Sequence, residues 1–414
     1  HDAPPLEQKT ARLQADRYLQ THKPEDLAGA SVSGKKLNES SYTFYYVQED
    51  EVIGEAKRAA FVTISGNTVT AYRSFFQPPD TFLQWLQQQD SRASLLTTLN
   101  LWINAAMAAA ALAFAIRYRR YVNRADGLVL LLIYVSIETL QYFNLYPNFV
   151  SMLTLRSLEW PFLIFEILYT FVINTVFALT VYFPYIGGKV LLLREGQSSL
   201  LPAKRGPARR SELMTAVSTG YWFAAVILAL QTIIFQSAEA WFDIWWIPDP
   251  MLSTDNMIWP LLMPLSAWAA AIGEEIVYRL FAITALKKLL NSTFAALLLS
   301  SMLWGLGHTL YPIYPVYTRF VEVTIIGLVF GYLFVRFGFV ASLFAHAAID
   351  SILMGLDVLK RGDLPSVICG LLYMIAPALI AWLLARWQPI NPDRSGPEPP
   401  PVVQLDPPQW NLFR

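Results

Sequence analysis

From residue 94 onward the chain is a series of apolar segments separated by short polar or charged stretches. Each segment is close to the ~20 residues that an α-helix needs to cross a bilayer. The pattern predicts an all-α polytopic membrane bundle of about nine transmembrane helices, within a membrane domain over residues 94–388. The expected spans are 94–116, 127–147, 160–186, 213–236, 259–284, 293–310, 319–335, 338–357 and 366–386.

The first 93 residues have a different pattern, which predicts a small soluble α+β domain. Runs of alternating or β-branched residues indicate strands, and the dipeptide Gly66-Asn67 is typical of a hairpin turn. Such a module usually binds or positions a partner, and it contains no visible catalytic set. The expected elements are a helix over 6–19, a strand over 42–47, a hairpin of 59–65 and 68–75, and a closing helix over 80–88.

Basic residues beside the spans predict the orientation of the bundle, because cytoplasmic loops are enriched in Lys and Arg. Alternation of nine spans puts four basic groups on one side, which makes residues 1–93 extracytoplasmic, as in a bacterial inner-membrane protein. Lys360 and Arg361 fall on the opposite side and oppose this assignment. The four groups are Arg117, Arg119, Arg120 and Arg124; Lys204, Arg205, Arg209 and Arg210; Lys287 and Lys288; and Arg386.

The proline-rich tail over 389–414 is expected to be cytoplasmic and extended or disordered. The chain starts with His1 rather than Met, and we expect a preceding segment to have been removed or left out.

Composition agrees with a membrane protein and excludes several other classes. Hydrophobic residues make up 55% of the chain and charged residues 15%, against about a quarter charged in soluble domains. The formal net charge is zero, so no nucleic-acid partner is expected. The lone cysteine, Cys369, excludes an intramolecular disulfide framework and a cysteine metal cluster.

The fifth span carries three ionisable residues, and such groups inside a membrane helix are functional by default because their burial is costly. Glu275 and Arg279 are four residues apart on one helix face, with the acid toward the N-terminus, which favours an ion pair. Glu274 is rotated about 100° away and lacks that partner. An unpaired carboxylate in an apolar site can act as a general base.

Two later spans each carry a histidine with a helical neighbour suited to orient it. Trp304 precedes His308 by four residues and is expected to stack over it, and His346 precedes Asp350 by four. A single membrane histidine is more often a hydrogen-bonding residue than a ligand. Together with the glutamates, however, these residues form a set that points to chemistry.

This ordered set on successive membrane helices resembles the CPBP family, which comprises the glutamate-dependent type II CAAX prenyl proteases and relatives linked to bacteriocin processing and immunity. The resemblance covers residues 213–388, and best 259–357. It implies that Glu274 and His308 hold and activate a water molecule. His346 and Asp350 would line the oxyanion side, and Arg279 would structure Glu275.

Two residues depart from the family pattern. Trp304 stands where Phe is usual, and Asp350 stands where the eukaryotic proteases have Asn. An ionised Asp350 cannot donate a hydrogen bond to an oxyanion, so it must be protonated or act by orienting His346.

The residues favour an intramembrane endopeptidase that cleaves membrane-tethered peptides or proteins. Activated water, a proton donor and oxyanion donors can all come from Glu and His without a nucleophilic Ser or Cys. We expect no cofactor, although two histidines and a carboxylate can also bind zinc. A non-catalytic membrane scaffold and a proton-coupled transporter remain open alternatives. The expected partners are membrane lipids, a membrane-anchored substrate, and an unidentified partner for residues 1–93.

The other acids in the apolar spans, Glu138, Glu166 and Glu322, have no motif around them and are given no catalytic role. Glu322 is expected to pair with Arg319.

Overall fold

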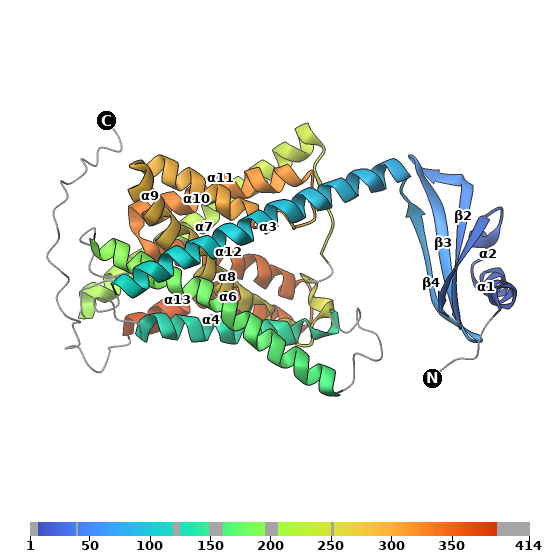
Figure 1. Ribbon diagram of the computed structural model, residues 1–414, viewed down its shortest axis with the longest axis horizontal. Helices are drawn as coiled ribbons and strands as arrows, with labels where there is room; N and C mark the ends of the chain where they lie inside the picture. Colours follow the sequence, from blue (N-terminus) through green and yellow to red (C-terminus); the bar gives the residue numbers. More distant parts are fainter. Residues whose placement is uncertain are drawn as a thin grey trace. The chain divides into compact units, whose positions relative to one another are not determined.

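The computed structural model of the chain describes residues 7–38, 40–118, 125–148, 160–194, 206–249 and 252–386. It divides into two compact units, His1–Ser91 and Arg92–Arg414. The first contains the sheet domain expected from the sequence, and the second contains the helical bundle (Figure 1). The proline-rich tail, the basic residues Arg119, Arg120, Arg124, Lys204 and Arg205, and the start of the chain lie outside the described residues.

The first unit is a four-stranded antiparallel sheet in the order β1-β2-β3-β4, packed against helix α1. Alternating buried residues on β2 and β3, including Phe44, Tyr46 and Val62, meet Ala15 and Leu19 of α1 in an apolar core. The expected hairpin is present, with Ser65 paired to Thr68 across the turn. The elements are α1 Gln8–His22, α2 Pro24–Leu27, β1 Ser31–Asn38, β2 Ser41–Ile53, β3 Ala56–Ser65 and β4 Thr68–Gln77.

Two features of this unit differ from the sequence expectation. Strand β1 occupies a stretch that looks like a polar connection, because Gly34 and its serines and lysines give it no hydrophobic alternation. The closing helix does not end near residue 88. It continues as the single 38-residue helix α3, Asp80–Arg117, which is also the first candidate membrane span.

In the described part of the chain, seven helices are long and apolar enough to cross a membrane. The sequence predicts about nine spans, and each expected span coincides with helical structure. The remaining two are helix α10, which has only 14 residues, and a run over 260–290 that is divided into several helical types. The seven are α3, α4 Ala125–Asn144, α6 Trp160–Arg194, α7 Gly206–Phe242, α11 Val316–Phe337, α12 Phe339–Leu359 and α13 Leu364–Arg386.

The divided run carries the glutamate pair. It opens with the 3-10 helix η4 (Pro260–Leu265), in which Pro264 lacks the amide hydrogen that a regular helix uses. Helix α8 (Ser266–Glu274), the π-helix η5 (Glu275–Ile283) and helix α9 (Thr284–Leu290) follow without a loop. A π-helical turn is rare and is found frequently at functional sites. Here it begins directly after Glu274.

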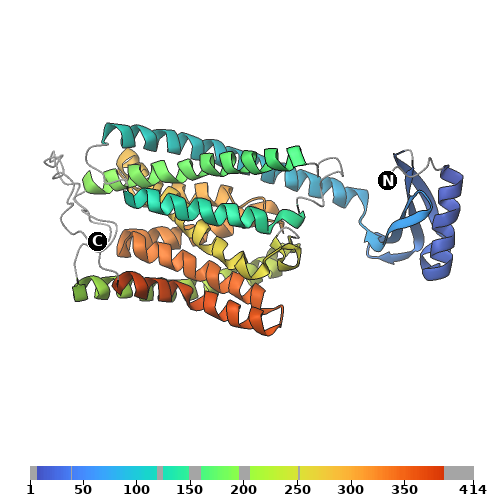
Figure 2. The same ribbon diagram turned by 90° about the horizontal axis from the view of Figure 1, so that it is seen from below.

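Sharp turns place the remaining helices beside this run. Asn291 adopts a left-handed conformation at the end of α9, and the Ser292 side chain accepts a hydrogen bond from Ala295 N to start α10 (Thr293–Leu306). Gly338 has φ +88°, a conformation that favours glycine, and it alone separates α11 from α12. The helices of the bundle run side by side (Figure 2).

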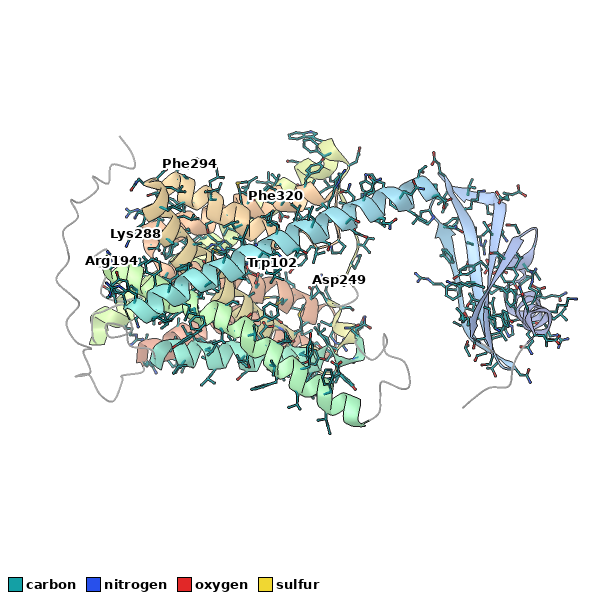
Figure 3. The ribbon with its side chains drawn as sticks, viewed as in Figure 1. Trp102, Arg194, Asp249, Lys288, Phe294 and Phe320 are labelled. Carbon is teal, nitrogen blue, oxygen red and sulfur yellow. The ribbon has the colours of Figure 1, made fainter. Side chains whose placement is uncertain are left out.

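The loops gather at two ends of the bundle in the way that alternating spans require. At one end, strands β5 (Trp245–Trp246) and β6 (Ile313–Tyr314) pair, and Asn144 accepts a hydrogen bond from Trp259 N at 2.7 Å. At the other end, Lys288 donates to the Leu191 carbonyl at 3.3 Å. Figure 3 shows Arg194 and Lys288 far from Asp249 along the bundle. Which end faces the cytoplasm stays a prediction.

Lys360 and Arg361, which oppose that prediction, each form an ion pair with a nearby carboxylate. Lys360 Nζ lies 2.7 Å from Asp357, and Arg361 Nη1 lies 2.9 Å from Asp255. The enrichment of cytoplasmic loops in Lys and Arg depends little on acidic neighbours, so these two residues still oppose the orientation expected from the other basic groups.

Candidate active site

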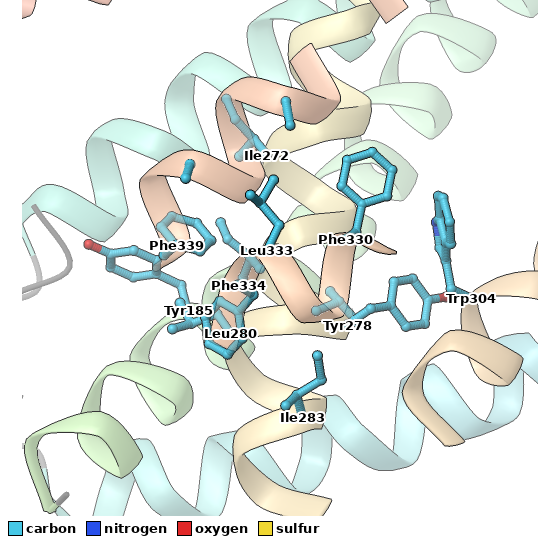
Figure 4. Packing of buried hydrophobic residues seen from close by; sticks show 14 of the residues in the cluster. Tyr185, Ile272, Tyr278, Leu280, Ile283, Trp304, Phe330, Leu333, Phe334 and Phe339 are labelled. Atoms are coloured by element: carbon cyan, nitrogen blue, oxygen red, sulfur yellow. The ribbon is translucent and has the colours of Figure 1, made fainter. Parts of the chain in front are cut away.

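Three elements bring the ionisable residues of the bundle together. The junction of α8 and η5 supplies Glu274 and Glu275, the turn after α10 supplies His308, and the middle of α12 supplies His346 and Asp350. All seven site residues expected from the sequence, including Arg279 and Trp304, lie in this one cluster. Ile272 and Leu280 from the divided run and Phe330 from α11 belong to the buried apolar cluster that also contains Trp304 (Figure 4).

Glu275 is fully buried and held from three sides. Its Oε1 lies 2.8 Å from His346 Nδ1, and its Oε2 accepts a hydrogen bond from the Ser342 hydroxyl. Arg279 Nη1 is 3.4 Å from Oε1, which confirms the expected ion pair but makes it the longest of the three contacts. Glu275, Arg279 and Ser342 are called the inner side of the site below. The sequence expectation that Arg279 alone structures Glu275 is therefore incomplete.

Arg279 is enclosed by aromatic rings. Its guanidinium carbon lies 4.2 Å from the centre of the Trp304 ring and 5.1 Å from that of Phe330. Its two terminal nitrogens have no hydrogen-bond partner among the described residues. Cation–π attraction of a desolvated guanidinium is about 2 kcal/mol or more, and together with Glu275 it offsets the cost of burying this charge.

Glu274 points to the opposite side of the junction, where 28% of its side chain is exposed. The sequence predicts that it lacks an ion-pair partner like that of Glu275, and it does not reveal that its Oε2 accepts a hydrogen bond from Trp304 Nε1. The same oxygen lies 4.0 Å from His308 Nε2 and 3.8 Å from His346 Nε2. Glu274, His308 and Asp350 are called the outer side of the site.

His308 has a defined tautomer when it is neutral. Its Nδ1 lies 2.9 Å from the Trp304 carbonyl oxygen, which can only accept, so Nδ1 carries the proton. Nε2 then presents a lone pair toward Glu274. The Trp304 and His308 rings meet edge-on, with centroids 5.0 Å apart and planes at 71°. The expected stacking is therefore replaced by an edge contact, since His308 lies in the turn after α10 and not on its helical face.

His346 connects the two sides of the site. Because the Glu275 carboxylate accepts hydrogen bonds, His346 Nδ1 is the donor in that contact. Its Nε2 lies 3.4 Å from Asp350 Oδ2, as the spacing on the helix predicts. Phe330 stacks on the ring, with centroids 4.9 Å apart and planes at 30°. The imidazole is therefore fixed in position and in plane.

Sequence reasoning missed Ser342, although a signal was present. Ser342, His346 and Asp350 are spaced by four residues along α12, which puts them on one helix face. Serine is common in membrane helices, where its hydroxyl usually bonds to a backbone carbonyl, so the residue type alone carries little information. Only the three-dimensional contact with Glu275 distinguishes it.

The other acids in the spans have surroundings of their own. Glu322 lies 2.7 Å from Arg319 Nη1, which confirms the expected pair, and accepts a second hydrogen bond from Gln231 at 2.9 Å. Glu166 accepts a long hydrogen bond of 3.4 Å from Tyr142. Among the described residues, no group of three or more His, Cys, Asp or Glu side chains is arranged to hold a metal ion.

Comparison with known proteins places this cluster in a family. Residues 256–352, which contain every site residue above, match the family model described as type II CAAX prenyl endopeptidase Rce1-like. This segment is a CPBP-family core. The matched family is a family of membrane proteases, and the chain is an integral, multi-pass membrane protein.

One curated relative is similar to part of the chain. The chain is 34% identical over 77 residues to the sporulation-killing factor biosynthesis protein SkfC of Bacillus subtilis strain 168. That alignment covers 19% of this chain and 16% of the relative. No solved structure matches the chain.

Proposed function

We propose that this protein is an intramembrane endopeptidase that hydrolyses membrane-tethered peptides with a water molecule activated by Glu274 and His308. The observation that carries the proposal is the 4.0 Å gap between Glu274 Oε2 and His308 Nε2. One water can bridge such a gap with two hydrogen bonds of about 2.8 Å. The water would donate one proton to a carboxylate oxygen and the other to an imidazole lone pair, so that its own lone pair is free to attack.

The reaction follows from these positions. Glu274 takes a proton from the water as the hydroxide adds to the scissile carbonyl carbon, which gives a tetrahedral oxyanion. When the carbon–nitrogen bond breaks, the departing amine takes the proton back from Glu274. Trp304 Nε1 holds the Glu274 carboxylate in place through the cycle. The products are a carboxylic acid and an amine, which exchange a proton to give a carboxylate and an ammonium group.

His346 is the oxyanion donor in this proposal. Both of its ring nitrogens face carboxylates, Glu275 at Nδ1 and Asp350 near Nε2, which favours a proton on each nitrogen. Because the ring is fixed, its Nε2 proton is available as a preorganised donor to an oxyanion that develops beside it, where such a donor contributes most. Asp350 cannot donate when ionised, so its role is to hold the His346 charge.

The proposal requires no metal or other cofactor. We further propose that the protein lies in a bacterial inner membrane with residues 1–93 outside, where this domain can bind a partner or a substrate. Membrane lipids and a lipid-anchored or membrane-spanning peptide are the partners that fit a site enclosed by apolar helices.

The purified full-length protein in liposomes, mixed with a membrane-anchored reporter peptide, tests the function. We expect cleavage by the wild type, cleavage in the presence of EDTA and phenanthroline, and none by Glu274→Gln. Loss of cleavage in chelator with recovery on adding zinc would make the enzyme a metalloprotease. Absence of cleavage would favour the scaffold, and proton-coupled flux in the same liposomes would favour a transporter.

A further inference from the structure

Helix α10 ends at Leu306, and the turn that follows it carries His308. The last carbonyl groups of any α-helix have no partner within the helix, and leaving them unpaired among apolar helices is costly. Leu303 and Leu306 are two such residues. Part of the compensation comes from Thr309, whose hydroxyl donates to the Leu306 carbonyl at 3.0 Å.

The remainder comes from α3, which lies outside the family-matched segment. Asn100 Nδ2 donates to the Leu303 carbonyl, and Thr97 Oγ1 lies 3.1 Å from Thr309 Oγ1 and 3.5 Å from the Leu306 carbonyl. The Thr309 hydroxyl also lies 3.1 Å from the Ala93 carbonyl, so its one proton is shared between this carbonyl and that of Leu306. Thr97, Asn100 and the backbone carbonyl of Ala93 therefore form a polar stripe on α3 that caps the turn around His308.

The same stripe also contacts the π-helix. Tyr278 follows Glu274 by four residues, and its hydroxyl accepts hydrogen bonds from Asn100 Nδ2 at 3.2 Å and Asn104 Nδ2 at 2.9 Å. Asn104 also donates to Asn100 Oδ1 at 2.6 Å, which fixes the orientation of the Asn100 amide. One side chain thus contacts both segments that supply the proposed water-activating pair.

We propose that Asn100 is a positioning residue of the active site, which sets the separation of Glu274 and His308 by joining Tyr278 to the end of α10. The inference rests on the proposed function. The fit at this point is close: a Cβ added at Gly307 would lie only 3.2 Å from Asn100 Oδ1. Gly307 therefore lets the α10 turn approach α3, and replacing Asn100 leaves that turn without its anchor.

The test is Asn100→Leu in the full-length protein, with Asn144→Leu as the matched control. Asn144 is also a buried asparagine that bonds to backbone, but it lies at the end of α4, and among the described residues its hydrogen bonds go to Gln141, Met257, Ile258 and Trp259, none of which belongs to the site. A displacement of about 1 Å can cost 10²-fold in rate, so we expect kcat per folded molecule to fall by about that factor with KM little changed. The control should lose thermal stability alone.

A double-mutant cycle separates positioning from general destabilisation. If Asn100 acts through His308, then Asn100→Leu should cost little further turnover in a His308→Ala background. Equal losses in both backgrounds, or a loss of turnover no greater than that of Asn144→Leu, would overturn the proposal. Thr97→Val removes a weaker contact to the same turn, and it should show a smaller loss of the same kind.

A second readout does not depend on turnover. The rate at which diethyl pyrocarbonate modifies His308, followed by mass spectrometry, should rise in Asn100→Leu and stay unchanged in Asn144→Leu. A rate equal to that of the wild type would contradict the positioning role even if the hydrolase proposal held. If the wild type cleaved no reporter peptide but Asn100→Leu still raised the modification rate of His308, the positioning role of Asn100 would stand and the proposed hydrolase function would be refuted.

Discussion

The two adjacent glutamates have opposite surroundings. On the inner side, Glu275 is 0% exposed and is bound by Ser342, His346 and Arg279. On the outer side, Glu274 is 28% exposed, with one hydrogen-bond donor and two histidine nitrogens about 4 Å away. A carboxylate whose oxygens are occupied is suited to fixing other groups, whereas one with free lone pairs beside a histidine is suited to proton transfer.

The change from one environment to the other takes place between consecutive residues, because a helix rotates by about 100° per residue. The π-helix begins at this point. Two consecutive residues therefore supply a buried structural carboxylate, Glu275, and a partly exposed reactive one, Glu274. His346 links them, because its Nδ1 is held by Glu275 and its Nε2 lies 3.8 Å from Glu274 Oε2. The following variants probe this contrast, from the largest expected effect to the smallest.

Substitutions on the outer side should lower turnover, and their effects should not be additive. Glu274→Gln and His308→Ala should each lower kcat on the reporter peptide by about 10²–10⁴-fold, the range of general-base catalysis. Because both residues act on the same water, the double variant should be no slower than the slower single one. Losses that multiply in the double variant would show that the two residues act in separate steps.

Substitutions on the inner side should lower the free energy of unfolding. Arg279→Met leaves the buried Glu275 charge without its cation, and breaking such a pair costs about 3–5 kcal/mol. Thermal unfolding in detergent measures this, with Lys360→Met as a control, since Lys360 and Asp357 form an exposed pair. An Arg279 variant that melts with the wild type would remove the distinction between the two sides.

Trp304 belongs to both sides, and Trp304→Phe isolates its hydrogen bond. Phenylalanine keeps a ring beside Arg279 and loses the donor to Glu274, so turnover should fall about tenfold, as expected for a hydrogen bond to a charged group. Trp268→Phe is the matched control, because Trp268 packs edge-on against Phe344 away from Glu274. A tenfold loss in the control as well would show that ring size, and not the donor, matters.

The smallest effect is expected at Ser342. Ser342→Ala removes one donor from Glu275 and should lower the free energy of unfolding by about 1 kcal/mol. Ser351, also buried on α12, has no hydrogen-bond partner for its hydroxyl among the described residues, and Ser351→Ala should cost less. Chemical denaturation of both variants decides this, and equal costs would mean that the contact with Glu275 adds nothing.

The residues that the sequence identified are those with recognisable chemistry at helical spacing. Glu274, Glu275, Arg279, His308, His346 and Asp350 are conspicuous because charged and imidazole groups are rare in apolar spans. Their grouping follows from the order of helices that the family resemblance implied. The N-terminal hairpin was equally accessible, since Gly66-Asn67 is a local signal.

The remaining features depend on contacts between elements distant in sequence. Glu275 binds Ser342 across 67 residues, and Asn100 binds the end of α10 across 203. No local pattern reveals such partners, because asparagine and serine form hydrogen bonds between many membrane helices, and the residue type does not say which group is bound. The sequence also does not predict the π-helix, since residues 275–283 have the composition of an ordinary apolar α-helix.

The most direct measurement compares Glu274→Gln with Glu275→Gln, each followed by thermal unfolding and by turnover of the reporter peptide. Glu274→Gln should lose turnover by about 10²–10⁴-fold and melt with the wild type, since shape and the Trp304 contact are kept. Glu275→Gln should lose stability and turnover together, because Arg279 remains charged and unpaired, and Arg279→Gln should restore part of that stability. Full turnover in Glu274→Gln, or two variants alike in both measurements, would contradict the division of roles between the two sides.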